Sequence, residues 1–400
     1  MKWAYVHCRI AAWWALNVLK DLIKEDIQNY KYTEQPKIFT IYSAYKTLEI
    51  NGKSYEIITA LPKFLNDIFA YYGEHHIKWI SSLFDYRNLM PIYPLLMKIL
   101  SYKIQKETPN HILISSFAVA KNINQCKKRS SLRGAKRRGN LSKSRYFNWI
   151  ASVPSQWRTS PKTTLYLHSP MQYIWSHHEE YTDKLKGFKW RLFKKITKYL
   201  RNRDKQFTKY DTIRANSQYT ADEGKKRYGF ESIVQYPQLN PLFLEDHSIT
   251  EADDYFVCVG RLVRFVREVD VIIKLFNHTK ERLLVIWSGP DELYLKSIAG
   301  GSIIFLGQLS VKDYLPILQK SRGLINLTKE SFGLWTAEAL CLGVPVFGYN
   351  QWATPELVDE DSGILVENKT LPHLLEKFDD FTNITRNKSK IQKLAKQKFH

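Results

Sequence analysis

The stretch GLINLTKESFGLWTAEALCLGVPVFGYN, residues 323–350, decides the fold class of this chain. Apolar residues run through 323–327 and again through 344–348, which is typical of strands buried on both faces. Between these runs, 334–342 has a helical pattern, and Gly333 stands where the helix begins. The stretch therefore predicts a strand–helix–strand unit of a parallel sheet, with Glu330 in the loop before the helix and Glu338 inside it.

The same alternation extends over the second half of the chain. Further predicted strands cover 255–259, 283–286, 303–306 and 363–366, and amphipathic helical patterns cover 269–277 and 311–319. Continuous apolar strands that alternate with helices indicate a parallel sheet covered on both faces. Residues 250–375 are therefore predicted to form one doubly wound α/β domain.

The first half repeats this pattern less clearly. Predicted strands cover 3–6, 38–42, 57–58, 111–115 and 164–168, and predicted helices cover 15–26, 188–210 and 220–228. We expect an N-terminal Rossmann-like domain over 1–240, a C-terminal one over 241–375 with a linker at 237–241, and a helical tail over 376–400. Two doubly wound domains would place a ligand in the cleft at the carboxyl ends of their sheets.

The charge of the chain points to an anionic partner. Its 400 residues carry a formal net charge of +21, and 44% hydrophobic residues exclude wholesale disorder. Between Cys126 and Lys162 there are eleven Lys or Arg and no Asp or Glu, which predicts an inserted basic loop over 126–162. This insertion is a solvated loop, a contact with anionic lipid or RNA, or a translated nucleotide repeat.

Several other classes are excluded or disfavoured. The four cysteines lie too far apart for a metal knuckle or a disulfide framework, which fits a cytoplasmic protein. No run of eighteen apolar residues is long enough to span a bilayer. No Asp-x-Asp motif follows a strand, since the acidic run 359–361 comes before one and reads as a solvated turn. We therefore expect no metal.

Three motifs resemble the retaining glycosyltransferases of family 4, which have the GT-B fold. Residues 330–358 resemble the family's carboxyl-terminal signature, and Glu330 and Glu338 match its pair of glutamates. The segment 259–262 resembles the strand-end motif in which Arg261 and a following basic residue, here Arg267, clamp the donor diphosphate. The segment 167–175 resembles the His-Ser-Pro-Met segment of a subset of the family, which implies that His168 contacts the transferred sugar.

The resemblance also implies roles around the start of the 334–342 helix. Backbone N–H groups near Ser331, Phe332 and Gly333 would meet the donor phosphates, because the first turn of a helix leaves such groups unpaired. Glu330 would lie near the sugar, and Glu338 would accept hydrogen bonds from the ribose. Without the family, Glu330 could equally be a carboxylate favoured by the helix dipole, Glu338 a surface residue, and His168 a core histidine.

The implied activity is the transfer of a hexose, with mannose as one guess, from a GDP- or UDP-linked sugar to a glycan or lipid-linked acceptor. The anomeric configuration would be retained, and no cofactor beyond the donor substrate is expected. The basic surface would also allow peripheral contact with the inner face of a membrane. The alternatives are a basic nucleic-acid-binding protein and a degenerate, non-catalytic homologue.

Five tryptophans occupy positions where the family has glycine or a small residue: Trp13, Trp14, Trp287, Trp335 and Trp352. Trp13 and Trp14 fall in the turn after the first strand, where glycines let backbone amides approach the donor phosphates. The chain has 11 Trp and only 17 Gly. Either the indoles fill the nucleotide pocket of a degenerate homologue, or the gene uses a code in which UGA means glycine and was translated as tryptophan.

Overall fold

The computed structural model describes residues 2–7, 9–10, 14–74, 89, 92–116, 161–182, 186–205, 209–263 and 267–399. The chain divides into two compact units. One unit comprises Met1–Tyr166 and Lys195–Ile213, and the other comprises Leu167–Lys194 and Arg214–His400. The second unit contains most of the predicted site residues.

The second unit contains a six-stranded, all-parallel sheet. Its strands are β11 (Phe256–Val259), β12 (Leu283–Ile286), β13 (Ile303–Gly307), β14 (Leu324–Asn326), β15 (Val346–Tyr349) and β16 (Gly363–Val366). They lie in the order β13-β12-β11-β14-β15-β16. The chain order reverses between β11 and β14, and in doubly wound sheets ligands bind where the strand order reverses.

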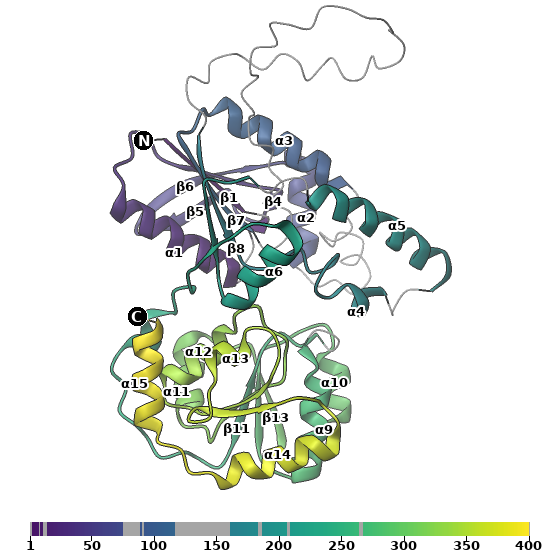
Figure 1. Cartoon of the computed structure of the whole chain (residues 1–400), viewed down its shortest axis with the longest axis vertical. Helices are drawn as coiled ribbons and strands as arrows, with labels where there is room; N and C mark the ends of the chain where they lie inside the picture. Colours follow the sequence, from purple (N-terminus) through teal and green to yellow (C-terminus); the bar gives the residue numbers. More distant parts are fainter. Residues whose placement is uncertain are drawn as a thin grey trace, which may run out of the picture. The chain divides into compact units, whose positions relative to one another are not determined.

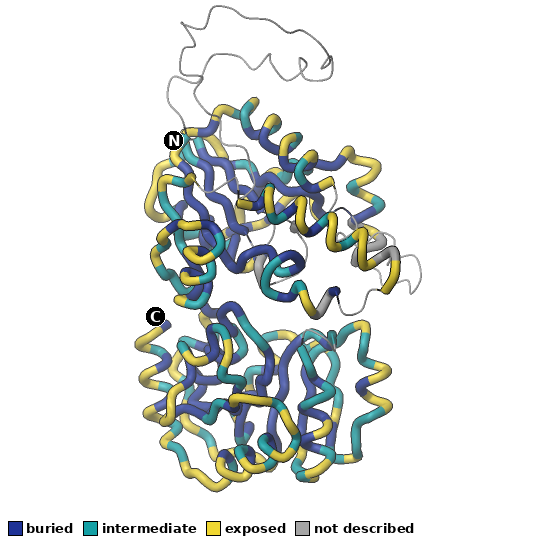
Figure 2. The backbone as a smooth tube through the Cα atoms, turned by 45° about the vertical axis from the view of Figure 1, so that its right-hand side comes forward, coloured by how far each residue is buried: buried dark blue, intermediate teal, exposed yellow. Residues whose placement is uncertain are grey.

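Helices cover both faces of this sheet (Figure 1). One hydrophobic core joins the strands to α9 (Val269–Thr279) and α14 (Leu371–Asn383). The other joins them to α11 (Val311–Gln319), α12 (Leu334–Cys341) and α15 (Lys388–Phe399). The central strands β11, β12 and β14 are accordingly buried along their length, whereas the edge strands β13 and β16 are only partly buried (Figure 2). The short helices α7 (Pro241–Leu244), α10 (Glu292–Ile298) and α13 (Thr354–Leu357) complete this part.

An eight-stranded sheet is built mainly from the first half of the chain. Its strands are β1 (Trp3–His7), β3 (Lys37–Thr40), β5 (Thr47–Ile50), β6 (Lys53–Thr59), β7 (His111–Ser116), β8 (Lys162–Leu167), β9 (Thr212–Ala215) and β10 (Ile233–Val234), in the order β10-β9-β8-β7-β1-β3-β6-β5. The pairings of β1 with β3 and β7 are parallel, whereas β5 and β6 form an antiparallel hairpin. A separate pair joins β2 (Arg9–Ile10) to β4 (Tyr42–Ser43). The helices that accompany these strands are α1 (Trp14–Asn29), α2 (Lys63–Glu74), α3 (Tyr93–Lys106), α4 (His178–Thr182), α5 (Gly187–Asp204) and α6 (Gln218–Tyr228).

The predicted strands and helices are all present, most with ends shifted by up to three residues. The β5–β6 hairpin and the helices α2 and α3 were not predicted. Most of the basic insertion, 126–160, lies outside the described residues, so its three interpretations stay open. None of the described helices is long and apolar enough to cross a membrane.

Candidate functional site

Three of the predicted residues lie in the segments at the point where the strand order reverses, and two of them are in contact. Arg261 follows β11, Arg267 precedes α9, and Glu330 lies in the loop after β14. A guanidinium nitrogen of Arg267 pairs with a carboxylate oxygen of Glu330, and these side chains are only 22% and 16% exposed. The backbone is also tied there, because the Thr328 hydroxyl donates to the Arg267 carbonyl at 3.4 Å.

The charges of these groups favour an anion. Burial, together with the positive charge of Arg261, lowers the pKa of Arg267 to about 10, while Cys258 acts in the opposite direction. Arg267 therefore stays charged at neutral pH, as does Arg261 because guanidinium groups do not lose their proton there. Two guanidiniums and the carboxylate of Glu330 leave a positive balance, which suits a diphosphate.

The loop after β14 leads into an uncapped helix start. Gly333 is the residue before α12 and has φ 100°, a backbone conformation that favours glycine, and no side chain caps the helix. Asn326, at the end of β14, donates to the Thr336 hydroxyl at 3.0 Å and so fixes the first turn of α12. Phe332 is buried, with its ring packed against Tyr236 and Phe399, so its backbone alone remains for a ligand.

Glu338 lies in the middle of α12 and is 7% exposed, so the alternative of a surface position is wrong. The Tyr314 hydroxyl donates a hydrogen bond to its Oε2 at 2.7 Å. Burial raises the pKa of Glu338 to about 8, and the bond from Tyr314 acts in the opposite direction. Tyr314, on α11, was not predicted as part of the site, because nothing in the local sequence connects it with Glu338.

Three aromatic side chains form a chain beside Glu338. The rings of Trp287 and Trp335 lie 5.4 Å apart, and those of Trp335 and Tyr314 lie 5.6 Å apart. Trp287 has φ 113° and Trp352 has φ 59°, which are values that favour glycine. These two angles agree with the glycine expected at both positions. Trp13 lies outside the described residues, and Trp14 begins α1.

The loops after β11 and β12 touch through their backbones. The Leu262 N–H donates to the Ser288 carbonyl at 3.1 Å, and the Asp291 N–H donates to the Leu262 carbonyl at 3.2 Å. A Cβ atom on Gly289 would lie 2.3 Å from the Leu262 oxygen. The glycine therefore allows the close approach that holds the segment after Arg261 in place.

His168 directly follows β8 and is completely buried. Its backbone carbonyl lies 3.4 Å from the hydroxyl of Thr220, and that hydroxyl lies 3.3 Å from the carbonyl of Ser331. The structure thus brings the His168 segment near the loop of Glu330, although the two are far apart in the sequence.

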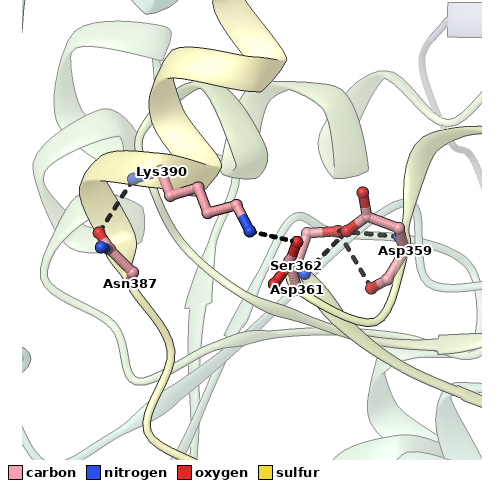
Figure 3. A network of polar contacts seen from close by, with 5 residues as sticks. All are labelled: Asp359, Asp361, Ser362, Asn387 and Lys390. Carbon is pink, nitrogen blue, oxygen red and sulfur yellow. Dashed lines mark hydrogen bonds and ion pairs between the residues drawn. The ribbon is translucent and has the colours of Figure 1, made fainter.

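The acidic turn before β16 is occupied by structural contacts (Figure 3). Asp359 accepts hydrogen bonds from the backbone and the hydroxyl of Ser362 at 2.9 and 2.6 Å, and Asp361 pairs with Lys390 at 2.6 Å. Asn387 in turn caps the backbone N–H of Lys390 at 3.0 Å. These carboxylates close a turn and anchor α15.

The part of the chain that contains Arg261, Arg267, Glu330 and Glu338 matches a known family model. Residues 253–381 match the family model described as glycosyl transferases group 1. A GDP-mannose-dependent monoacylated alpha-(1-6)-phosphatidylinositol monomannoside mannosyltransferase from Corynebacterium glutamicum is 28% identical over 200 residues, which are 42% of this chain. The match covers 52% of that relative, so the chain spans about half the length of the curated protein it matches.

Solved structures resemble the whole chain. Sucrose-phosphate synthase from Thermosynechococcus elongatus has a TM-score of 0.66 at 12% identity, with 100% of this chain and 94% of that chain covered. The lipopolysaccharide outer core galactosyltransferase WaaB has a TM-score of 0.61 at 12% identity, with 100% and 96% covered. HepE of Anabaena, solved in complex with UDP, has a TM-score of 0.58 at 14% identity, with 100% and 96% covered. The chain therefore has the GT-B fold, and its residues 253–381 match the family model of the glycosyl transferases group 1.

Proposed function

We propose that this protein transfers a hexose from a nucleoside-diphosphate sugar to an acceptor hydroxyl, with retention of the anomeric configuration. The observation that carries the proposal is the pairing of Arg267 with Glu330 at the strand-order reversal of the family-matched region, where the charge of Arg261 also acts on Arg267. A cationic pair beside an uncapped helix start is the chemistry that a leaving diphosphate requires.

In the proposed reaction, the bond between the anomeric carbon and the β-phosphate oxygen breaks, and the acceptor oxygen bonds to the same face of that carbon. The acceptor proton passes to the departing phosphate oxygen. Arg261, Arg267 and the first N–H groups of α12 would neutralise the charge that develops on the diphosphate, without a metal. Glu330 would orient Arg267 and the sugar, Glu338 would bind the ribose, and His168 would contact the transferred sugar.

The proposed donor follows from the nucleotides that are named for two similar proteins. The Corynebacterium relative is named as GDP-mannose-dependent, and HepE was solved with UDP. Mannose from GDP-mannose is the donor that we place first, with UDP-linked hexoses second. A glycan or lipid-linked acceptor is proposed on the same ground, because the Corynebacterium relative is named for a phosphatidylinositol mannoside.

Helix α5 supports a lipid-linked acceptor at a membrane surface. It carries seven Lys or Arg, and its single acidic residue, Asp204, is completely buried. Trp190, Leu192 and Tyr199 are exposed at 37%, 45% and 51%, and the Lys194 ammonium lies 3.7 Å from the centre of the Trp190 ring. Basic residues combined with exposed aromatic and aliphatic ones are typical of helices that bind anionic lipid surfaces.

Calorimetric titration with GDP and UDP tests the donor site, followed by transfer assays with GDP-mannose and UDP-glucose and by NMR of the product's anomeric proton. Arg261→Ala combined with Arg267→Ala should abolish binding. Arg322→Ala is the matched control, since Arg322 pairs with Asp254 and Glu281 away from the loop of Glu330. Wild-type protein that binds neither nucleotide would contradict the proposal, as would an inverted product.

Co-sedimentation with vesicles tests the membrane contact. The triple variant Lys194→Glu, Lys195→Glu, Lys198→Glu should lose its binding to vesicles that contain phosphatidylglycerol and keep its affinity for nucleotide. Unchanged sedimentation of this variant would show that α5 is not the contact.

A further inference from the structure

Helix α6 begins with a serine whose hydroxyl connects the start of the helix to the loop that contains Glu330. Ser217 is the residue before the helix, and its side-chain oxygen accepts a hydrogen bond from the backbone N–H of Thr220 at 3.0 Å. The same hydroxyl donates to the carbonyl oxygen of Ser331 at 2.6 Å. A hydroxyl has one proton to donate, and the Ser331 carbonyl at 2.6 Å is a much closer acceptor than the side-chain oxygen of Asn216 at 3.4 Å, so Ser217 donates mainly to the loop that contains Glu330.

Thr220 reaches both segments of the proposed site. Its hydroxyl lies 3.3 Å from the carbonyl oxygen of Ser331 and 3.4 Å from that of His168, which is the geometry of one proton shared between two acceptors. Ser217 and Thr220 are both completely buried. Through these hydrogen bonds they act on the backbone of the two segments.

The segment after β15 also bonds to the start of α6 and to the loop that contains Glu330. The carboxylate of Glu356 accepts hydrogen bonds from the backbone N–H groups of Gln218 and Tyr219, at 2.8 and 2.5 Å. A carboxylate at the N-terminus of α6 is also favoured by the helix dipole. Three residues earlier, the Ala353 N–H donates to the carbonyl of Glu330 at 3.1 Å. Glu330 and Ser331 are thus both held by their carbonyl oxygens.

We propose that Ser217 and Thr220 are positioning residues for donor binding: they fix the backbone of Ser331 and His168, so that the loop 330–333 is held ready for the donor diphosphate. The inference rests on the proposed function for the role of that loop. The contacts to Ser331 and His168 stand independently of it.

The test must separate positioning from helix capping. Glycine and threonine cap helices about equally well, but only threonine keeps a hydroxyl that can donate to Ser331. Ser217→Gly and Ser217→Thr are therefore a matched pair, and Thr220→Val and Thr220→Ser are a second one. Ser310→Ala is the control, because Ser310 precedes α11 and its hydroxyl donates to Asp313 at the exposed surface.

We expect Ser217→Gly and Thr220→Val to raise the KM for the nucleotide sugar about five- to ten-fold, the worth of one hydrogen bond. The KM for the acceptor should change little, and the melting temperature should fall by about a few degrees, because the lost bond is also part of the folded structure. Ser217→Thr, Thr220→Ser and the Ser310 control should behave like the wild type.

Amide hydrogen exchange of the peptide that contains 330–334 provides a readout that does not need activity. It should be faster in Ser217→Gly than in Ser217→Thr. Wild-type KM together with wild-type exchange in Ser217→Gly would overturn the inference. If exchange responds as expected but the wild type binds no nucleotide, the hold on Ser331 stands and the proposed function fails.

Discussion

The burial of Glu338 determines whether its carboxyl group is protonated when a ligand binds. Its pKa of about 8 lies well above the ordinary value of 4.5, because the low-dielectric surroundings disfavour the charged form. Between these two values the folded protein holds a proton that the unfolded chain has lost. The contribution of Glu338 to the free energy of unfolding therefore falls as the pH rises from 4.5 to about 8. The loss is about 1.4 kcal/mol for each unit of difference between the two pKa values, and the contribution stays constant above about pH 8.

The first prediction is a pH dependence of nucleotide binding. A ribose hydroxyl donates more strongly to a carboxylate than to a carboxylic acid, so UDP or GDP should bind more tightly as the pH rises from 7 to 8.5, by up to about ten-fold per unit. Glu338→Gln should bind weakly at every pH and should lack the loss of stability towards pH 8. Calorimetry above pH 7 avoids the titration of the phosphate itself, and a flat wild-type profile would contradict the ribose role.

Trp287 combines a strained backbone with a place in the aromatic chain. For a bulky residue, φ 113° costs on the order of 1–3 kcal/mol. Its ring lies 5.4 Å from that of Trp335, which in turn lies 5.6 Å from that of Tyr314, the residue bonded to Glu338. Under the proposed ribose role of Glu338, these indoles would compete with the ribose for space. The backbone thus favours glycine at 287, as the comparison with the family motif also does.

We therefore predict that the double variant Trp287→Gly, Trp335→Ala binds UDP or GDP at least about ten-fold more tightly than the wild type, a gain of about 1.4 kcal/mol. Trp190→Ala, which removes an exposed indole on α5, is the control and should leave the affinity unchanged. Equal affinities in calorimetry would refute the occlusion. The gene provides an independent check, since a UGG codon at any of the five tryptophans contradicts the misread-glycine interpretation.

Some residues of the site could be found from sequence and others could not. Arg261 and Glu330 follow strands and Arg267 precedes a helix, so that local pattern and family resemblance point to them. Tyr314 lies 24 residues before Glu338 on another helix, and only the packing of α11 against α12 brings them together. Ser217 carries a capping signal, but its bond to Ser331 spans 114 residues and leaves no trace in the sequence.

At the scale of elements, continuous apolar runs predict the parallel strands well because both faces of these strands are buried. The β5–β6 hairpin was missed although Asn51-Gly52 is a strong hairpin signal, and both residues have the positive φ angles that this turn requires, 51° and 71°. Helix α3 was missed because its buried residues, such as Leu96 and Leu100, are interrupted by exposed apolar ones that blur the period.

The contact between the loops after β11 and β12 gives a prediction at this scale. Gly289→Ala should destabilise the protein by about 2 kcal/mol or more, because the new Cβ would lie 2.3 Å from the Leu262 oxygen and the backbone would have to move. Gly301→Ala is the matched control, since no atom lies within 4 Å of its added Cβ. Urea unfolding measures both variants, and equal stability would show that the loops are not locked together.

At the scale of the whole molecule, the net charge of +21 attracts any polyanion, so binding to vesicles or to RNA does not by itself identify a partner. Coulombic attraction is screened by salt, whereas the burial of apolar side chains in lipid is not. Ionic strength therefore separates membrane contact through α5 from the nucleic-acid alternative.

We predict that the protein binds both single-stranded RNA and vesicles with about 30% anionic lipid at low salt, and that only vesicle binding survives at about 0.5 M NaCl. The surviving part should come from Trp190, Leu192 and Tyr199, whose exposed side chains can enter the headgroup region. The variant with alanine at all three positions should lose vesicle binding at high salt. It should keep its affinity for nucleotide and its binding to vesicles at low salt. RNA retained at high salt with vesicles released would instead favour the nucleic-acid function, because a bound base can stack on aromatic side chains and resist screening.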